Sequence, residues 1–266
     1  MLKLNGHVVN VTKFPDGTSQ VWKLSEELLV SCELCDKYRV TWIFENEGEL
    51  FQIFQLLNFL VGSFKEKPVV LNCPFLPYSR QDKEVSNKSC SALNTFCMII
   101  GVFVDELQTF DVHNPSFFEN KKLCPFKFTN ILPYDQINKI IKEEKIDLLI
   151  FPDEGASTRY PDLHLSEIKS VSADKIRDQL TGEIIGLELP PITIGASVLV
   201  VDDLCDGGRT FIELAKAIKN NYPVEVILYV SHGIFSKGIK TVFDAGYDKI
   251  YTKDGLQADR SSYLEI

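Results

Sequence analysis

Short apolar runs alternate along this chain with segments of helical periodicity, and no other sequence feature constrains the fold as strongly. Strands without a polar face indicate a parallel sheet that helices cover on both sides. The sequence therefore predicts an α/β fold with mostly parallel sheets flanked by helices. The predicted strands are 39–44, 69–72, 107–112, 147–151, 197–201 and 224–230, and the predicted helices are 47–64, 134–145 and 209–220.

The alternation also predicts two halves of similar length, divided near residues 131–135. We expect domains at 1–133 and 134–266. In open α/β sheets ligands bind beyond the carboxyl ends of the strands, so functional side chains should follow the strands. The segments in such positions are 72–74, 111–113, 152–156, 202–210 and 231–233.

Composition excludes several classes of protein. A formal net charge of -9 disfavours nonspecific nucleic-acid binding, because the phosphates would be repelled. The apolar stretches are far shorter than the roughly 20 residues of a membrane span, and the first ten residues lack the pattern of a signal peptide. We therefore expect an intracellular, cytoplasmic protein without a membrane partner.

The cysteines indicate reduced thiols rather than a disulfide framework. There are 7 of them, an odd number, and the one close pair is Cys32 and Cys35. That pair has zinc-knuckle spacing but no second pair to complete a site. Buried or surface thiols are the expected outcome, with no role assigned to this pair.

The strongest local pattern lies in residues 197–210. An apolar strand leads to adjacent carboxylates, Asp202 and Asp203, and then to a loop with two glycines that ends in Thr210 at a helix start. Carboxylates accept hydrogen bonds from ribose hydroxyls, while glycine-rich backbone and a helix N-terminus bind phosphate. The pattern predicts a sugar-phosphate site, with a helix cap and glycine turn as the structural alternative.

This segment resembles type I phosphoribosyltransferases, and within them the ribose-phosphate pyrophosphokinases. The resemblance extends over most of the chain and follows the order of that family's motifs. The similar segments are 14–17 (Phe-Pro-Asp-Gly), 77–83 (Pro-Tyr-Ser-Arg-Gln-Asp-Lys), 110–113 (Phe-Asp-Val-His), 152–156 (Pro-Asp-Glu-Gly-Ala), 174–177 (Asp-Lys-Ile-Arg) and 202–210.

The resemblance implies two phosphoribosyltransferase-like domains, the first on the ATP side and the second on the ribose-phosphate side. The implied reaction transfers the β,γ-diphosphate of MgATP to the C1 hydroxyl of ribose 5-phosphate, giving phosphoribosyl diphosphate and AMP for nucleotide biosynthesis. The implied cofactor is Mg²⁺, with ATP as co-substrate. A homo-oligomer built on dimers is also implied.

The resemblance assigns four groups of site residues. ATP contacts fall on Phe14, Asp16, Gly17, Arg80, Gln81 and Asp82. Ribose-phosphate contacts fall on Asp202, Asp203, Asp206, Gly207, Gly208, Arg209 and Thr210. Metal contacts fall on His113 and Asp153, and the catalytic cations are Lys175 and Arg177. The structural alternatives are a packing role for His113 and a solvated loop for Lys175 and Arg177.

The chain departs from the family pattern in three respects. The segment before Phe14 is short and Thr18 replaces a glutamate, which affects the adenine pocket and the subunit contact. The whole chain is also shorter than the cellular enzymes, which bears on their allosteric sites. In the ribose-phosphate loop, Gly207 stands in place of a threonine and Arg209 is an added cation.

The third departure leaves the acceptor open. A wider and more positive loop suits a diphosphate such as that of ADP-ribose, an acceptor that would serve NAD rebuilding, or else Arg209 points to solvent from the first helical turn. Two further classes are a base phosphoribosyltransferase, which leaves Arg80 and Gln81 unexplained, and a noncatalytic regulator, which the catalytic and metal residues oppose.

Overall fold

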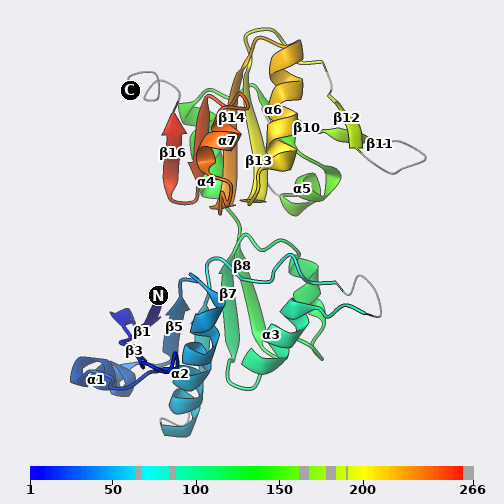
Figure 1. The fold of residues 1–266 in the computed structure, drawn as a ribbon. Coiled ribbons are helices and arrows are strands. Elements are labelled where there is room, and N and C mark those ends of the chain that lie inside the picture. The colour runs from blue at the N-terminus through cyan, green and yellow to red at the C-terminus, as the bar shows by residue number, and fades with distance from the viewer. Residues whose placement is uncertain (64–66, 84–87, 162–167, 178–183, 190, 260–266) are drawn as a thin grey trace. The chain divides into compact units, whose positions relative to one another are not determined.

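The computed structural model describes residues 1–63, 67–83, 88–161, 168–177, 184–189 and 191–259 (Figure 1). The chain divides into two units, Met1–Ile131 and Leu132–Ile266. Among the described residues, each unit contains a 6-stranded sheet, mostly parallel and flanked by helices. The predicted α/β fold class is confirmed.

The sheet of the first unit has the strand order β2-β1-β5-β6-β7-β8. Strands β5 to β8 run parallel, while β1 and β2 form an antiparallel edge. The strands are β1 (Leu2–Leu4), β2 (His7–Val8), β5 (Tyr38–Trp42), β6 (Val69–Asn72), β7 (Glu106–Phe110) and β8 (Lys127–Ile131), and a separate hairpin joins β3 (Thr12–Lys13) to β4 (Ser19–Gln20).

The helices of the first unit pack their apolar faces on this sheet. In α2 (Leu50–Ser63) the side chains of Ile53, Leu56, Leu57 and Leu60 are fully buried, as the helical period predicts. The other helical segments are α1 (Glu26–Leu34), η1 (Glu47–Glu49), α3 (Ala92–Ile100) and η2 (Pro115–Glu119).

The sheet of the second unit has the strand order β10-β9-β13-β14-β15-β16, parallel except for β16 at the edge. Its strands are β9 (Leu148–Phe151), β10 (Lys169–Ser172), β13 (Ser197–Cys205), β14 (Glu225–Gly233), β15 (Lys249–Thr252) and β16 (Gly255–Asp259), and β11 (Asp174–Arg177) pairs separately with β12 (Ile184–Glu188). Its helices are α4 (Tyr134–Glu143), α5 (Glu154–Arg159), α6 (Arg209–Asn221) and α7 (Ile239–Phe243).

The central strand β13 shows why the sequence runs are continuously apolar. Val198 and Val200 pack in one cluster with Leu214 of α6, whereas the alternate residue Leu199 packs in a second cluster with Ile137 of α4. Each face of the strand is thus covered by a helix, so neither set of alternate side chains reaches water.

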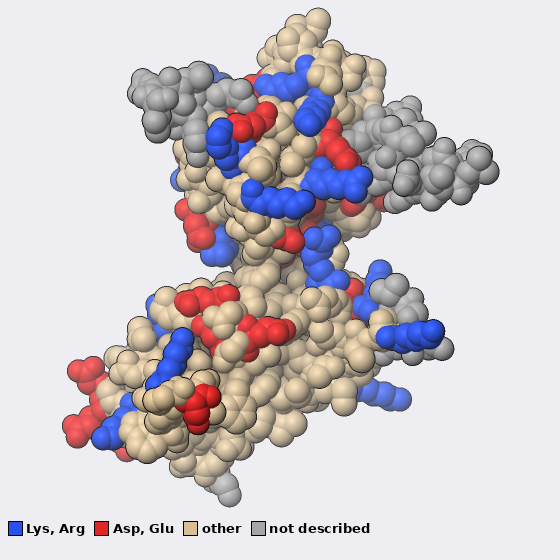
Figure 2. Space-filling view, in the orientation of Figure 1, with Lys and Arg blue, Asp and Glu red and all other residues tan. Residues whose placement is uncertain are grey.

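Charged side chains of both signs are spread over the surface. Figure 2 shows Lys and Arg side chains gathered on the face of the second unit that carries α6 and α7. Within the part of the chain that the structure describes, no helix combines the length and apolar character needed to cross a bilayer.

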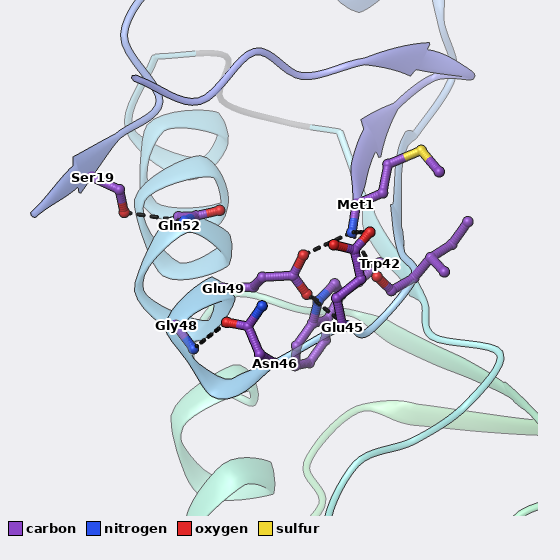
Figure 3. Close-up of polar contacts among 9 residues, drawn as sticks. Met1, Ser19, Trp42, Glu45, Asn46, Gly48, Glu49 and Gln52 are labelled. Carbon is purple, nitrogen blue, oxygen red and sulfur yellow. Dashed lines mark hydrogen bonds and ion pairs between the residues drawn. The ribbon is translucent and has the colours of Figure 1, made fainter. Parts of the chain in front are cut away.

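The half-buried carboxylate of Glu49 ties the start of the chain to the segment that leads into α2 (Figure 3). Glu49 Oε1 accepts a hydrogen bond from the N-terminal ammonium of Met1 at 2.7 Å, and Glu49 Oε2 accepts one from Trp42 Nε1 at 2.8 Å. Burial alone would raise the pKa of Glu49, but these hydrogen bonds outweigh it and leave the pKa below its ordinary value. The carboxylate joins β1, β5 and the entry to α2.

Several boundaries differ from the sequence-based expectation. Strand β13 continues to Cys205, because β14 pairs with it as far as the Cys205–Gly233 register, so Asp202 and Asp203 lie inside the strand and the loop begins after them. The run predicted as 107–112 ends as a strand at Phe110, because Asp111 has a left-handed φ of 48°.

Candidate functional site

Two carboxylates and one guanidinium form the charged centre of the second unit. Asp202 and Asp203 lie near the carboxyl end of β13, and Nη1 of Arg159 is 2.8 Å from Oδ1 of each. All three side chains are largely buried, with only 6% of the Arg159 side chain exposed. Arg159 is the last residue of α5, which follows the neighbouring strand β9.

Among the described residues, the charged groups of this centre are the two acids and the guanidinium of Arg159. Burial, followed by the charge of Asp203, raises the pKa of Asp202 to about 7, although Arg159 acts in the opposite direction. Burial opposes the charge of Arg159, but Asp203 and Asp202 outweigh it and raise the guanidinium pKa further above its ordinary value. The carboxyl oxygens of this centre can accept hydrogen bonds from hydroxyl groups.

Asp153 begins the helix that delivers Arg159. Its Oδ1 accepts a hydrogen bond from the backbone N–H of Ala156 at 3.0 Å, which makes Asp153 the N-cap of α5. The residue thus sits at the carboxyl end of β9, in the position expected for a ligand-binding loop. Its carboxylate has at least one structural task besides any contact with metal.

The glycine loop connects β13 to α6. Gly208 is the N-cap of α6 with a left-handed φ of 74°, and a Cβ there would lie 2.6 Å from Val242 Cγ2 of α7. A side chain is excluded at this position by both backbone conformation and packing. Asp206 is exposed, whereas Gly207 and Thr210 are half-buried.

Arg209 extends along the surface of α6. Its side chain is 82% exposed, and its Nε donates to Glu213 Oε1 at 2.9 Å, one helical turn further on. Such i,i+4 pairs are common on solvated helix faces. In this conformation the Nε of Arg209 is used in a hydrogen bond within α6.

The predicted catalytic cations lie on an antiparallel hairpin. Lys175 pairs with Leu187, and Arg177 with Ile184, in the β11–β12 ladder. The backbone here is a strand rather than the loop considered from the sequence. The side chains of Lys175 and Arg177 lie outside the described part of the structure.

Two strand-end loops meet in the first unit. Asn114 Nδ2 donates to Asp82 Oδ2 at 2.6 Å, so the segment after β7 is joined to the segment that carries Arg80 and Gln81. His113 is half-buried next to Asn114, while Arg80 and Gln81 are exposed. The structure thus brings Arg80, Gln81, Asp82 and His113 into neighbouring loops beyond the ends of β6 and β7.

The other predicted ATP contacts lie on the β3–β4 hairpin. Gly17 has a φ of 86° in the turn, and Asp16 Oδ1 accepts hydrogen bonds from the N–H and hydroxyl of Thr18 at 3.0 and 2.7 Å. Phe14 packs edge-on against Trp22 and lines a pocket of about 620 Å³ beside α2. Gln55 of α2 holds the hairpin by donating to the carbonyl of Ser19 at 2.9 Å.

The donor chemistry of the predicted metal contacts fits one kind of Mg²⁺ site. Among the described residues no cluster of three or more His, Cys, Asp or Glu side chains could hold a metal ion. Mg²⁺ bound to nucleotide phosphates keeps several waters and needs only one or two protein groups. The imidazole of His113 in the first unit suits contact with one such ion or with its water ligands, and the carboxylate of Asp153 in the second unit suits contact with a second ion.

Sequence reasoning missed Arg159 and Asn114. Arg159 lies on the helix that Asp153 caps. The one indication in the sequence was that two adjacent acids at the end of a buried strand need a cation nearby. No local pattern identifies which cation it is, because 43 residues separate Arg159 from Asp202. Asn114 was equally hidden, since its partner Asp82 is 32 residues away.

Comparisons with known proteins show which proteins this chain resembles. Residues 138–260 match the family model described as Phosphoribosyl transferase domain. The chain is 26% identical over 242 residues to the ribose-phosphate pyrophosphokinase of Pyrococcus abyssi, covering 88% of this chain and 80% of that protein. It is 28% identical over 256 residues to the ribose-phosphate pyrophosphokinase of Mycoplasmopsis pulmonis, covering 92% and 75%.

A solved structure extends the comparison to the fold. The phosphoribosylpyrophosphate synthetase from Mycobacterium smegmatis superposes with a TM-score of 0.66 at 17% sequence identity, over 80% of this chain and 70% of that one. The architecture of two phosphoribosyltransferase-like domains is consistent with this match. The resemblance found from the sequence motifs is confirmed.

Proposed function

We propose that this chain, a divergent relative of the ribose-phosphate pyrophosphokinases, is an enzyme that transfers the β,γ-diphosphate of MgATP to the C1 hydroxyl of ribose 5-phosphate. The products are phosphoribosyl diphosphate and AMP. The observation that carries the proposal is the acid pair Asp202–Asp203, held by Arg159 directly before a glycine loop and the start of α6.

The second unit would bind the acceptor. Carboxylate oxygens of Asp202 and Asp203 would accept hydrogen bonds from the ribose hydroxyls, while Arg159 limits the repulsion between the two acids. The backbone N–H groups of Gly207 and Gly208, with Thr210 and the positive end of α6, would bind the 5-phosphate. Asp206 belongs to the same loop.

The first unit would bind the donor nucleotide. Arg80 would place its guanidinium on phosphate oxygens and Gln81 would add an amide, with Asp82 and Asn114 fixing the loop. The hairpin residues Phe14, Asp16 and Gly17 would contact the adenine. These residues orient the triphosphate so that its β-phosphorus can be attacked.

Lys175 and Arg177 would stabilise the charge that develops on the transferred diphosphate. When bound, Mg²⁺ would neutralise the triphosphate and polarise its oxygens. His113 would contact one Mg²⁺ or its waters beside the triphosphate, and Asp153 would hold a second Mg²⁺ near the ribose. Mg²⁺ is thus the proposed cofactor, and a dimer-based homo-oligomer stays a prediction.

Ribose 5-phosphate is the proposed acceptor in preference to ADP-ribose. A diphosphate acceptor would require a further cation at the glycine loop, and Arg209, the one named for that role, is 82% exposed and pairs with Glu213. Without a contact from Arg209, the second phosphate of ADP-ribose adds little binding affinity over the single phosphate of ribose 5-phosphate.

A substrate comparison tests the proposal. The protein is incubated with ATP and either ribose 5-phosphate or ADP-ribose, with Mg²⁺ or with EDTA, and products are identified by mass spectrometry. We expect AMP and a diphosphorylated sugar in equal amounts, only with Mg²⁺ and preferentially with ribose 5-phosphate. Consumption of phosphoribosyl diphosphate with a purine base would instead identify a base phosphoribosyltransferase. Failure with every acceptor would indicate a noncatalytic relative.

A further inference from the structure

A lysine outside every motif described so far lies against the glycine loop. Lys237 belongs to the turn between β14 and α7. A Cβ placed on Gly207 would be 3.6 Å from Lys237 Cε and 4.0 Å from its Nζ. The lysine side chain therefore runs along the space that a side chain at position 207 would enter.

The backbone holds this turn beside the loop. The N–H groups of Ile234 and Phe235 both donate to the carbonyl of Cys205, at 2.9 and 3.1 Å, and Gly238 N donates to Phe235 O at 2.7 Å. Cys205 is the last residue of β13 and directly precedes Asp206. The turn that carries Lys237 is thus tied to the start of the glycine loop.

Helix α7 fixes the turn from its other end. Val242 occupies the space beside Gly208, where a Cβ would approach its Cγ2 to 2.6 Å. Because the backbone is held on both sides of Lys237, the remaining freedom is that of the lysine side chain itself. Its ammonium can reach an anion in the loop without moving the backbone.

The pairing of the neighbouring cations indicates that Lys237 is available to bind an anion in the glycine loop. In the described part of the chain its Nζ makes no hydrogen bond or ion pair, whereas Arg209 is bound to Glu213 at 2.9 Å and Lys240 to Asp244 at 2.9 Å. Asp206 places an exposed carboxylate in the loop, so an incoming phosphate needs a compensating cation. Figure 2 shows the gathering of cations on this face of the unit.

We propose that Lys237 binds the terminal phosphate of the acceptor, in place of the side-chain contact that Gly207 cannot make. The ligand class is a sugar phosphate whose anionic end enters the glycine loop. The inference rests on the proposed function for the identity of the acceptor. Lys237, rather than Arg209, then supplies the positive charge of the phosphate subsite.

Direct binding tests the inference without turnover. Ribose 5-phosphate, inorganic phosphate and unphosphorylated ribose are titrated into the full chain by calorimetry, for the wild type, Lys237→Ala, Lys237→Arg and the control Lys240→Ala. Losing a charge-assisted contact should weaken ribose 5-phosphate binding about ten- to a hundredfold in Lys237→Ala. Lys237→Arg should keep most of the affinity, and Lys240→Ala should match the wild type.

A rescue variant separates phosphate binding from a general effect on the loop. Gly207→Thr has no left-handed φ to strain it, and in the Lys237→Ala background it should recover part of the lost affinity by supplying a hydroxyl. Ribose itself should bind equally in all variants. Arg209→Ala should leave ribose 5-phosphate binding largely unchanged.

The inference is overturned if Lys237→Ala binds ribose 5-phosphate as the wild type does, if Arg209→Ala carries the loss instead, or if the wild type binds neither phosphate ligand. Steady-state kinetics shows whether a negative result contradicts the role of Lys237 or the proposed reaction. An active wild type with an unchanged acceptor KM in Lys237→Ala contradicts the inference alone. A wild type that binds phosphate through Lys237 but forms no AMP contradicts the reaction alone.

Discussion

At the scale of single residues, the second unit depends on Arg159, a buried cation that lies between two buried acids. Its Nη1 lies 2.8 Å from both Asp202 and Asp203. A buried charge that loses its partner has no water to replace it. The same residue therefore links the stability of the unit to the form of the proposed acceptor site.

We predict that Arg159→Met destabilises the protein by about 3–5 kcal/mol, because the two buried carboxylates then lose the cation that lies 2.8 Å from each of them. Urea unfolding measures this loss. The matched control is Arg209→Ala, which removes an exposed i,i+4 pair and should cost about 0.5 kcal/mol or less. Adding Asp203→Asn to Arg159→Met should restore part of the stability. A loss no greater than that of the control would show that Arg159 is not needed to hold the acids.

The residues of the site were only partly predictable from the sequence. Asp202, Asp203 and Gly208 could be found because the strand, the acids and the loop are consecutive in the chain. Arg159 and Lys237 could not, since the fold alone brings Arg159 to the acid pair and Lys237 to the glycine loop, and no local pattern marks either residue. The sequence identified Arg209 as an added cation at the loop. It could not decide whether the side chain contacts a phosphate or, as in the structure, pairs with Glu213.

At the scale of elements, the junction of β13, α6 and α7 depends on Gly208. Its φ of 74° favours glycine, and Val242 of α7 occupies the space where a Cβ would lie. Gly195 offers a matched comparison, because its φ is 80° and a Cβ there would have no atom within 4 Å. A substitution at Gly195 therefore introduces backbone strain alone, whereas one at Gly208 introduces both backbone strain and a packing clash.

Gly195→Ala should cost about 1–2 kcal/mol from backbone strain alone. Gly208→Ala should cost a further 1–3 kcal/mol, roughly, because it also overpacks α7. Both are measured by urea unfolding, and Val242→Ala combined with Gly208→Ala should recover the packing part. Equal losses at the two glycines would contradict close packing of α7 on the loop.

The connection of β1, β5 and α2 through Glu49 should be pH-dependent. The pKa of Glu49 in the folded protein lies below its ordinary value of 4.5. Its stabilisation is therefore fully present above about pH 4.5 and is lost as the pH falls through the lower folded value. We expect Glu49→Gln to cost about 1–3 kcal/mol at pH 7 and less near pH 3.

Thermal unfolding at the two pH values measures the effect. Glu45→Gln is the matched control, because Glu45 also contacts the N-terminal ammonium but its side chain is 61% exposed. The control should lose much less stability at pH 7. A loss in Glu49→Gln that stays constant with pH would mean that the carboxylate charge is not responsible.

At the scale of the whole molecule, the α/β class and the inner strands of both sheets could be predicted from the sequence. Strands such as β6 and β9 are apolar on both faces, so their composition identifies them. The edge strand β2, the short pairs β3–β4 and β11–β12, and the six-residue helix α5 could not be found in this way. Such elements are too short or too polar for periodicity to be informative.

The central claim concerns which bond of ATP is broken. Cleavage between the α- and β-phosphates leaves AMP, whereas ordinary phosphoryl transfer leaves ADP. ATP labelled in its α-phosphate therefore reports the bond directly, whichever acceptor is used. The labelled product is separated by chromatography after reaction with Mg²⁺ and ribose 5-phosphate, and the sugar product is quantified in parallel. We predict labelled AMP, formed in equal amount with phosphoribosyl diphosphate and absent without the acceptor. Labelled ADP, or AMP formed without a matching diphosphorylated sugar, would contradict diphosphate transfer.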